Sequence, residues 1–267
     1  MHHWTKRLFA IAAPLLLAGC LWGPGKFTSD LTLRKDGSFV LDYRGEMVLQ
    51  LPPDETTAAQ PWSDDKAKCQ QGDEDRACTK AEIATQKAQF EKEKQESVAR
   101  KRKEAEDMAK VFGLPGLDEA SNRAFAAKLM KFAGWRSVTY RGKGVFDVVY
   151  HFEGRSTQDF LFPALPDNDL IIPFIAIRRR SDGAVLVTAP AFTGGAGPLG
   201  AKAGASAAES MKGGPVSRAQ GRFTVITDGE ILTNNSEDGA SSHAIGRQLH
   251  WDVGPASNKI PETLIRL

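Results

Sequence analysis

The sequence lacks the short motifs that usually mark an enzyme active site. It has no Gly-x-Ser-x-Gly nucleophile elbow, no His-Glu-x-x-His zinc motif and no Cys-x-x-Cys pair. Histidine is scarce beyond residue 19, where only His151, His243 and His250 occur, in three separate segments. We therefore expect a protein that is not an enzyme and that holds no metal and no cofactor.

The chain also has no excess of charge of either sign beyond its N-terminal segment. The whole sequence has 35 basic and 33 acidic residues, and residues 1–19 contain Lys6 and Arg7 but no acidic residue. The remainder is therefore balanced at a net charge of zero. A balanced chain lacks the basic surface that non-specific nucleic-acid binding requires, so we expect no nucleic-acid partner.

Cysteine is rare as well, and the first of three cysteines ends a recognisable N-terminal pattern. A polar head is followed by the apolar run Leu8–Leu17, which is too short to span a bilayer and is typical of a secretory signal. The run leads into Leu17-Ala18-Gly19-Cys20, which resembles the lipobox of bacterial lipoproteins. The alternative is an ordinary signal peptide with an incidental cysteine.

The lipobox resemblance implies a membrane anchor at Cys20. Residues 1–19 would be removed as a signal peptide, and Cys20 would carry fatty acids such as palmitate, which hold the chain to a membrane without spanning it. Residues 20–26 would form a short lipidated tether. Leu21, which is not an aspartate, favours the periplasmic face of the outer membrane of a bacterial cell envelope.

Cys69 and Cys78 remain as a pair in an oxidising compartment. A disulfide between them is favoured there, and two free thiols are the alternative. A metal site would need further cysteine or histidine ligands at short spacing, and none flanks the pair.

The order of expected elements predicts an α+β fold. Apolar residues alternate on both sides of Lys35-Asp36-Gly37, which predicts a β-hairpin. A long charged helix is expected over residues 79–112, with a thin apolar stripe whose C-terminal half packs. A shorter helix runs from Asp118 to about Phe132, with Phe125, Leu129 and Phe132 at core spacing. About four antiparallel strands follow.

These elements predict an antiparallel β-sheet with both helices packed on one face, and a C-terminal β segment. The domain boundaries that we expect are an α+β domain over residues 27–193, a Gly/Ala-rich flexible linker or loop over 194–216, and the β segment over 217–267. The pattern leaves open whether that last segment completes the first sheet or forms a separate module.

The lipobox, "RKDGSF", "GWRSVTYRGKGVFDVVYHFEG" and "TDGEILTNNSEDG" together resemble the LppM-type lipoproteins of bacterial envelopes. This resemblance implies an α+β domain that meets envelope lipids or glycolipids. Some members of that family have a C-terminal transmembrane helix, which this sequence does not contain.

Two hypotheses for function follow. In the first, a non-catalytic globular domain binds a lipid, a glycolipid or a protein partner at the membrane surface. Arg178 and Arg180, at the end of an apolar strand, are candidate contacts to an anionic headgroup, because guanidinium groups match phosphate oxygens. In the second, the chain is a structural or assembly factor that docks onto an envelope protein through helix 79–112.

Overall fold

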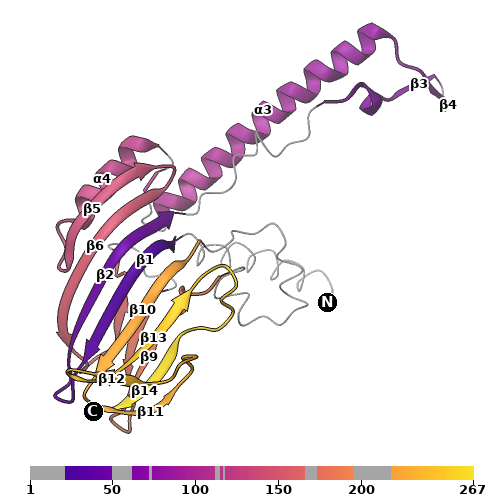
Figure 1. The fold of residues 1–267 in the computed structure, drawn as a ribbon. Coiled ribbons are helices and arrows are strands. Elements are labelled where there is room, and N and C mark those ends of the chain that lie inside the picture. The colour runs from indigo at the N-terminus through magenta and orange to yellow at the C-terminus, as the bar shows by residue number, and fades with distance from the viewer. Residues whose placement is uncertain are drawn as a thin grey trace, which may run out of the picture. The chain divides into compact units, whose positions relative to one another are not determined.

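The computed structural model describes residues 22–49, 62–71, 74–111, 115–116, 118–165, 173–194 and 218–267. The chain divides into two compact units, of which one comprises residues 1–51 and 115–267 and the other residues 52–114. The first unit contains two sheets and a short helix, and the second contains a long helix and a small hairpin (Figure 1). The expected mixed α+β class is confirmed.

A seven-stranded sheet forms the larger part of the first unit. Its strands, in spatial order, are β12 (Ser241–His243), β13 (Gly246–Val253), β10 (Gln220–Thr227), β1 (Trp22–Leu33), β2 (Ser38–Leu49), β6 (Val145–Arg155) and β5 (Trp135–Gly142). The hairpin expected around Lys35-Asp36-Gly37 joins β1 to β2, and Gly37 supplies the positive φ of 81° that the turn needs. All neighbours are antiparallel except β1 and β10, which pair in parallel.

The second sheet has five strands. Their order is β11 (Glu230–Asn234), β14 (Glu262–Arg266), β9 (Val185–Thr188), β8 (Ile175–Arg179) and β7 (Phe160–Phe162), and every pair is antiparallel. The C-terminal β segment thus contributes strands to both sheets. It completes the fold of the first unit and does not form a module of its own.

Aromatic side chains fill the space between the two sheets. Phe27 of β1 stacks on Phe192, which follows β9, with ring centroids 4.1 Å apart. Tyr43 of β2 lies 5.1 Å from Phe162 of β7 and 6.0 Å from Phe174. These rings are fully or almost fully buried, so the two sheets pack face to face over a common core.

Helix α4 (Glu119–Leu129) covers another part of the same face. Phe125 of α4 contacts Phe146 of β6, whereas Tyr150 of β6 contacts Phe162 of the second sheet. Residues 146 and 150 lie on one face of β6 because side chains alternate along a strand. Helix α4 and the five-stranded sheet therefore share one face of the larger sheet, with α4 beside β5 and β6 (Figure 1).

The C-terminal end of α4 comes earlier than expected. The helix ends at Leu129, and the backbone then tightens, with Phe132 N–H donating to the carbonyl of Leu129. Phe132 is 44% exposed and is not a core residue, unlike Phe125 and Leu129. The helical spacing predicted its burial wrongly because the turn toward Gly134 changes the direction of the side chain.

The expected tether over residues 20–26 is also wrong in part. Residues 22–26 belong to β1, where Trp22 pairs with Leu49, Gly23 with Val48 and Pro24 with Met47. Trp22 is 4% exposed and stacks against Phe125, 5.5 Å away. Residue 22, the first that the structure describes, thus already belongs to the folded domain. Residues 20 and 21, the signal segment 1–19 and positions 195–217 of the expected linker lie outside the described residues.

The second unit contains a 3-10 turn (Asp64–Lys66), the hairpin of β3 (Cys69–Gln71) and β4 (Glu74–Arg76), and helix α3 (Lys80–Val111). Trp62 contacts Phe90 of α3, with ring centroids 5.5 Å apart. No α3 side chain that the structure describes is buried, including those of Ile83, Phe90 and Val98. The expected packing of the C-terminal half rests on residues 105, 108 and 112, whose side chains lie outside that description.

Candidate functional site

Three places in the fold bring polar or reactive groups together: the face of the seven-stranded sheet that no described element covers (the uncovered face), the disulfide of the second unit, and the end of the sheet where β1 begins. The sequence indicated the cysteines but not the first or the third place.

The uncovered sheet face carries a histidine held between two carboxylates. His151 of β6 is paired in register with Asp42 of β2, and its Nδ1 lies 2.8 Å from Asp42 Oδ1. Its Nε2 lies 3.2 Å from Glu153 Oε1. The hydrogen bond to Asp42, followed by that to Glu153, raises the pKa of His151 above its ordinary value. The two carboxylates thus favour the protonated, cationic form of the His151 imidazole.

Other charges on this face are also paired. His250 Nε2 lies 3.1 Å from Asp238 Oδ2, and Arg222 forms two hydrogen bonds to Asp252, of 2.7 and 3.0 Å. Within the described ranges, no group of three or more His, Cys, Asp or Glu side chains is placed to hold a metal ion. The paired charges give the face a polar, solvated surface.

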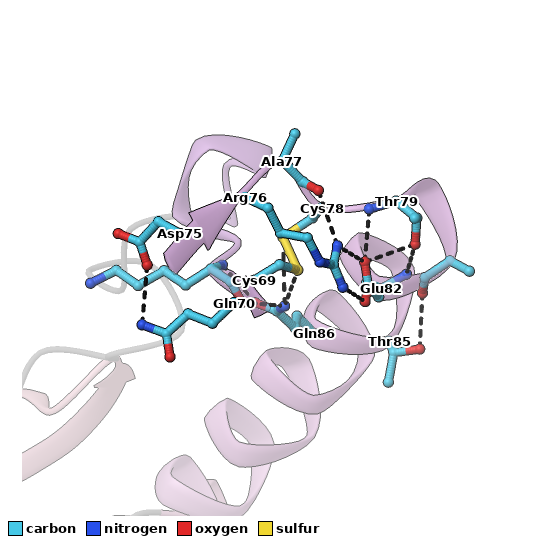
Figure 2. The surroundings of a disulfide bond; sticks show 12 residues. Cys69, Gln70, Asp75, Arg76, Ala77, Cys78, Thr79, Glu82, Thr85 and Gln86 are labelled. Carbon is cyan, nitrogen blue, oxygen red and sulfur yellow. Dashed lines mark hydrogen bonds and ion pairs between the residues drawn. A yellow bond between two sulfur atoms is a disulfide. The ribbon is translucent and has the colours of Figure 1, made fainter. Parts of the chain in front are cut away.

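The expected disulfide pair is brought together by the small hairpin of the second unit. Cys69 begins β3, Cys78 follows β4, and the two residues are joined in a disulfide with Cα atoms 5.3 Å apart (Figure 2). The segment between them, which we expected to be a polar flexible loop, instead contains two paired strands. The disulfide closes the open end of this hairpin beside the first turns of α3.

Gln86 of α3 connects the disulfide hairpin to the helix. Its side-chain amide accepts a hydrogen bond from Lys68 N–H (3.1 Å) and donates one to the Lys68 carbonyl (3.0 Å). The same Nε2 lies 3.5 Å from the sulfur of Cys69 (Figure 2). Gln86, about two turns into α3, therefore holds the disulfide hairpin against the helix.

A capping box starts α3 directly after the bridge. Thr79 N–H donates to Glu82 Oε2 (2.8 Å), and Glu82 N–H donates back to Thr79 Oγ1 (3.3 Å), which satisfies two donors at the helix start. Arg76 also bonds Glu82 through both ends of its guanidinium group (Figure 2). These hydrogen bonds lower the pKa of Glu82 to about 2, and the bond from Arg76 has the largest effect. The spacing Thr-x-x-Glu in the sequence is the signal for this cap.

The two candidate headgroup arginines have separate partners. Arg178 Nε lies 3.8 Å from Asp159, and Arg180 Nε lies 3.4 Å from Asp182. Strand β8 ends at Arg179, so Arg180 already belongs to the following turn. Both side chains are exposed, and a phosphate group would have to compete with the two carboxylates.

The third place is the end of the seven-stranded sheet where β1 begins. Trp22 pairs there with Leu49, the last residue of β2, and Leu49 N–H donates to the carbonyl of Gly144 (2.7 Å). Gly144 and Lys143 form the two-residue turn between β5 and β6. Both have positive φ, 74° and 52°, as in a type I′ hairpin turn.

Lys143 is the single non-glycine residue with a positive φ in the part of the chain that the structure describes. Its side chain is exposed and forms no ion pair with a described residue, whereas nearby Arg141 pairs with Asp147 and Arg123 with Glu119. We refer to the start of β1, the end of β2 and the turn Lys143–Gly144 as the Trp22 end of the sheet.

Within the described residues, no helix is both long and apolar enough to cross a membrane. The chain matches no protein-family model, and no curated protein sequence matches it significantly.

Proposed function

We propose that the chain is a bacterial envelope lipoprotein, anchored at Cys20, whose non-catalytic domain binds a lipid, a glycolipid or a protein partner at the membrane surface. The observation that carries the proposal is the Leu-Ala-Gly-Cys sequence placed directly before the first strand of the fold. Cys20 lies two positions before Trp22, so a cut before Cys20 would keep every residue that the structure describes.

The cysteine pairing supports this assignment. Cys69 and Cys78 bond to each other, so of the three cysteines in the sequence Cys20 is the one without a disulfide role. A structural disulfide is typical of proteins in oxidising compartments such as the periplasm. The similarity to LppM-type lipoproteins favours a bacterial envelope, and the residue Leu21 favours its outer membrane.

The core favours binding at the surface of the domain. The apolar side chains that could line a lipid cavity, such as Phe146, Tyr150 and Phe162, contact neighbouring rings at centroid distances between 4.5 and 6.0 Å. Their apolar surface is buried where the seven-stranded sheet packs against α4 and the five-stranded sheet. We therefore place the interaction with a partner on the outside of the domain.

Metabolic labelling with a fatty acid tests the anchor. The wild-type protein should carry label, have the mass of a chain shortened by 19 residues plus its lipid, and partition with membranes. Cys20→Ser should lose both the label and the membrane fraction. Cys69→Ser, a matched substitution at another cysteine, should keep both. Membrane partitioning of Cys20→Ser together with an unlabelled wild type would overturn the proposal.

Helix α3 favours a second candidate, a structural or assembly factor that docks onto an envelope protein. The helix is 32 residues long, and its half-buried apolar residues Ile83, Phe90 and Val98 follow one face. Substitution of Val98 by lysine distinguishes the two candidates. It should release a docked protein partner if α3 is the binding element and should leave a lipid ligand in place.

A further inference from the structure

We propose that the Trp22 end of the sheet faces the membrane and that Lys143 contacts the phosphate groups of anionic lipids there. This inference rests on the proposed acylation of Cys20 and adds to it the orientation of the domain and the class of lipid. Three observations carry it: the length of chain after the anchor, the position of the turn Lys143–Gly144, and the unusual backbone of Lys143.

The first observation is that almost no chain separates the anchor from the fold. One residue, Leu21, lies between Cys20 and Trp22. Two peptide units span at most about 7 Å, so an acylated Cys20 would hold the start of β1 that close to the bilayer surface. Trp22 is buried against Phe125 and paired with Leu49, so the strand start is fixed within the domain.

The second observation is that the turn Lys143–Gly144 lies at the same end of the sheet. Strand β2 separates β1 from β6, and adjacent strands are about 4.8 Å apart, so the turn lies about 10 Å to the side of Trp22. The bond from Leu49 N–H to the Gly144 carbonyl fixes it to the end of β2. A Cβ on Gly144 would come within 2.5 Å of the Leu49 carbonyl oxygen.

The third observation is that lysine occupies a position suited to asparagine or glycine. The first residue of a type I′ turn requires a positive φ, which a lysine adopts only with strain. Strained residues that persist in a fold often serve function. The neighbouring Arg141 and Arg123 already have acidic partners, whereas Lys143 forms no ion pair with a described residue and can contact a phosphate.

The opposite end of the sheet provides an internal control. Lys35 is also an exposed turn lysine, but it lies two residues beyond the end of β1, which spans 12 residues. At about 3.3 Å per residue, Lys35 lies about 36 Å or more from the start of β1. That distance exceeds the screening length of about 10 Å at 0.1 M salt, so the membrane surface has little effect on it.

Amine footprinting of the acylated full-length mature protein tests the proposal. Vesicles contain either phosphatidylglycerol with phosphatidylethanolamine or phosphatidylcholine alone, and acetylation of each lysine is followed by mass spectrometry. On phosphatidylglycerol vesicles Lys143 should react about fivefold more slowly than in the unanchored Cys20→Ser protein, while Lys35 is unchanged. On phosphatidylcholine this protection should be lost.

A second measurement reports proximity without depending on the lysine charge. With Cys20 acylated and Cys69 bonded to Cys78, a cysteine introduced by Lys143→Cys or Lys35→Cys is the single free thiol. A spin label at position 143 should be far less accessible to a water-soluble relaxation agent than one at position 35.

The outcomes separate this inference from the proposed function. Equal footprints for Lys143 and Lys35 on an acylated, membrane-bound protein, or protection of Lys35 alone, would overturn the orientation and leave the anchor standing. Protection of Lys143 that persists equally on phosphatidylcholine would overturn the contact with anionic lipid. Absence of lipid on Cys20 would overturn the proposed function and, with it, this inference.

Discussion

Replacement of Trp22 by alanine tests whether this residue belongs to the folded core or to an exposed tether. In the structure Trp22 is 4% exposed and contacts the rings of Phe125 and Phe146 at 5.5 and 5.4 Å. A tryptophan in a tether would be exposed, and its removal would change the free energy of unfolding by less than about 0.5 kcal/mol. The two descriptions of residues 22–26 therefore predict different stabilities.

The expected loss follows from the buried area. A tryptophan buries about 150–250 Å², which at about 25 cal/mol per Å² gives about 4–6 kcal/mol as an upper estimate. Measured substitutions of buried aromatic residues by alanine cost about 3–5 kcal/mol. We expect Trp22→Ala to lower the free energy of unfolding by about 4 kcal/mol. For a unit of this size, the midpoint temperature should fall by about 8–16 °C.

Two further variants make the measurement specific. The Trp22 indole N–H has no hydrogen-bond partner within the described structure, so Trp22→Phe loses no hydrogen bond and should cost less than about 1.5 kcal/mol. Trp62→Ala removes the same side chain from the second unit and should leave the unfolding of the sheets unchanged.

Urea and thermal unfolding of residues 20–267 carrying Cys20→Ser, followed by the β-sheet signal in circular dichroism, provide the values. A loss below about 1 kcal/mol for Trp22→Ala would refute the assignment of Trp22 to the core. An equal loss for Trp62→Ala would show that the signal does not report on the sheets alone.

Two further predictions concern charge and redox state. The pKa of His151 is raised in the folded protein, so its bond to Asp42 stabilises the fold fully below the unfolded pKa of about 6.5, and this stability is lost as pH rises through the higher folded pKa. The contribution should be about 0.2–1 kcal/mol. Asp42→Asn should lower the pKa of His151 toward its ordinary value in an NMR titration and should weaken the pH dependence of stability in urea unfolding, although the bond to Glu153 remains. An unchanged titration of His151 in that variant would contradict the assignment. Thiol alkylation without reductant should label neither Cys69 nor Cys78, and labelling of both would contradict the disulfide. Reduction should accelerate amide exchange in the first turns of α3, because the disulfide that closes this short loop contributes up to about 2.5 kcal/mol to stability.

The sequence predicted the elements whose chemistry is local. The sequence predicted a hairpin at Lys35-Asp36-Gly37, and the structure has one there. The same signal, a glycine at positive φ between two antiparallel strands, recurs in the structure at Lys143-Gly144 and Asp182-Gly183. Such turns depend on the residues in them and on alternation in the flanking strands. The start of the shorter helix at Asp118 was also predicted from its local sequence. The disulfide partners were predicted from the number of cysteines and the expected compartment.

Features that depend on distant parts of the chain were not predictable in this way. Gly23, Pro24 and Gly25 resemble a linker by composition, yet they lie in β1. The pairing register with β2 shifts after Pro24, and a Cβ on Gly25 would come within 2.7 Å of Glu46 Cβ. Glycine is used here for close approach, not for flexibility. The sequence pattern cannot reveal a neighbour twenty residues away.

The pairing of His151 with Asp42 illustrates the same limit. Each residue alternates with apolar neighbours, which predicts that it faces solvent. Their contact depends on the register between β2 and β6, and this register is fixed by packing across the whole sheet.

The parallel pairing of β1 with β10 has a consequence for the timing of folding. The hairpin of β1 and β2 can form as soon as residues 22–49 are available, but the other edge of β1 waits for residues 220–227. That edge of β1 therefore remains open until most of the chain is available for folding. The two sheets can therefore close only when nearly all of the chain is present. A chain interrupted before residue 220 would expose an apolar strand edge to aggregation and proteolysis, so quality control should remove incomplete molecules before they accumulate.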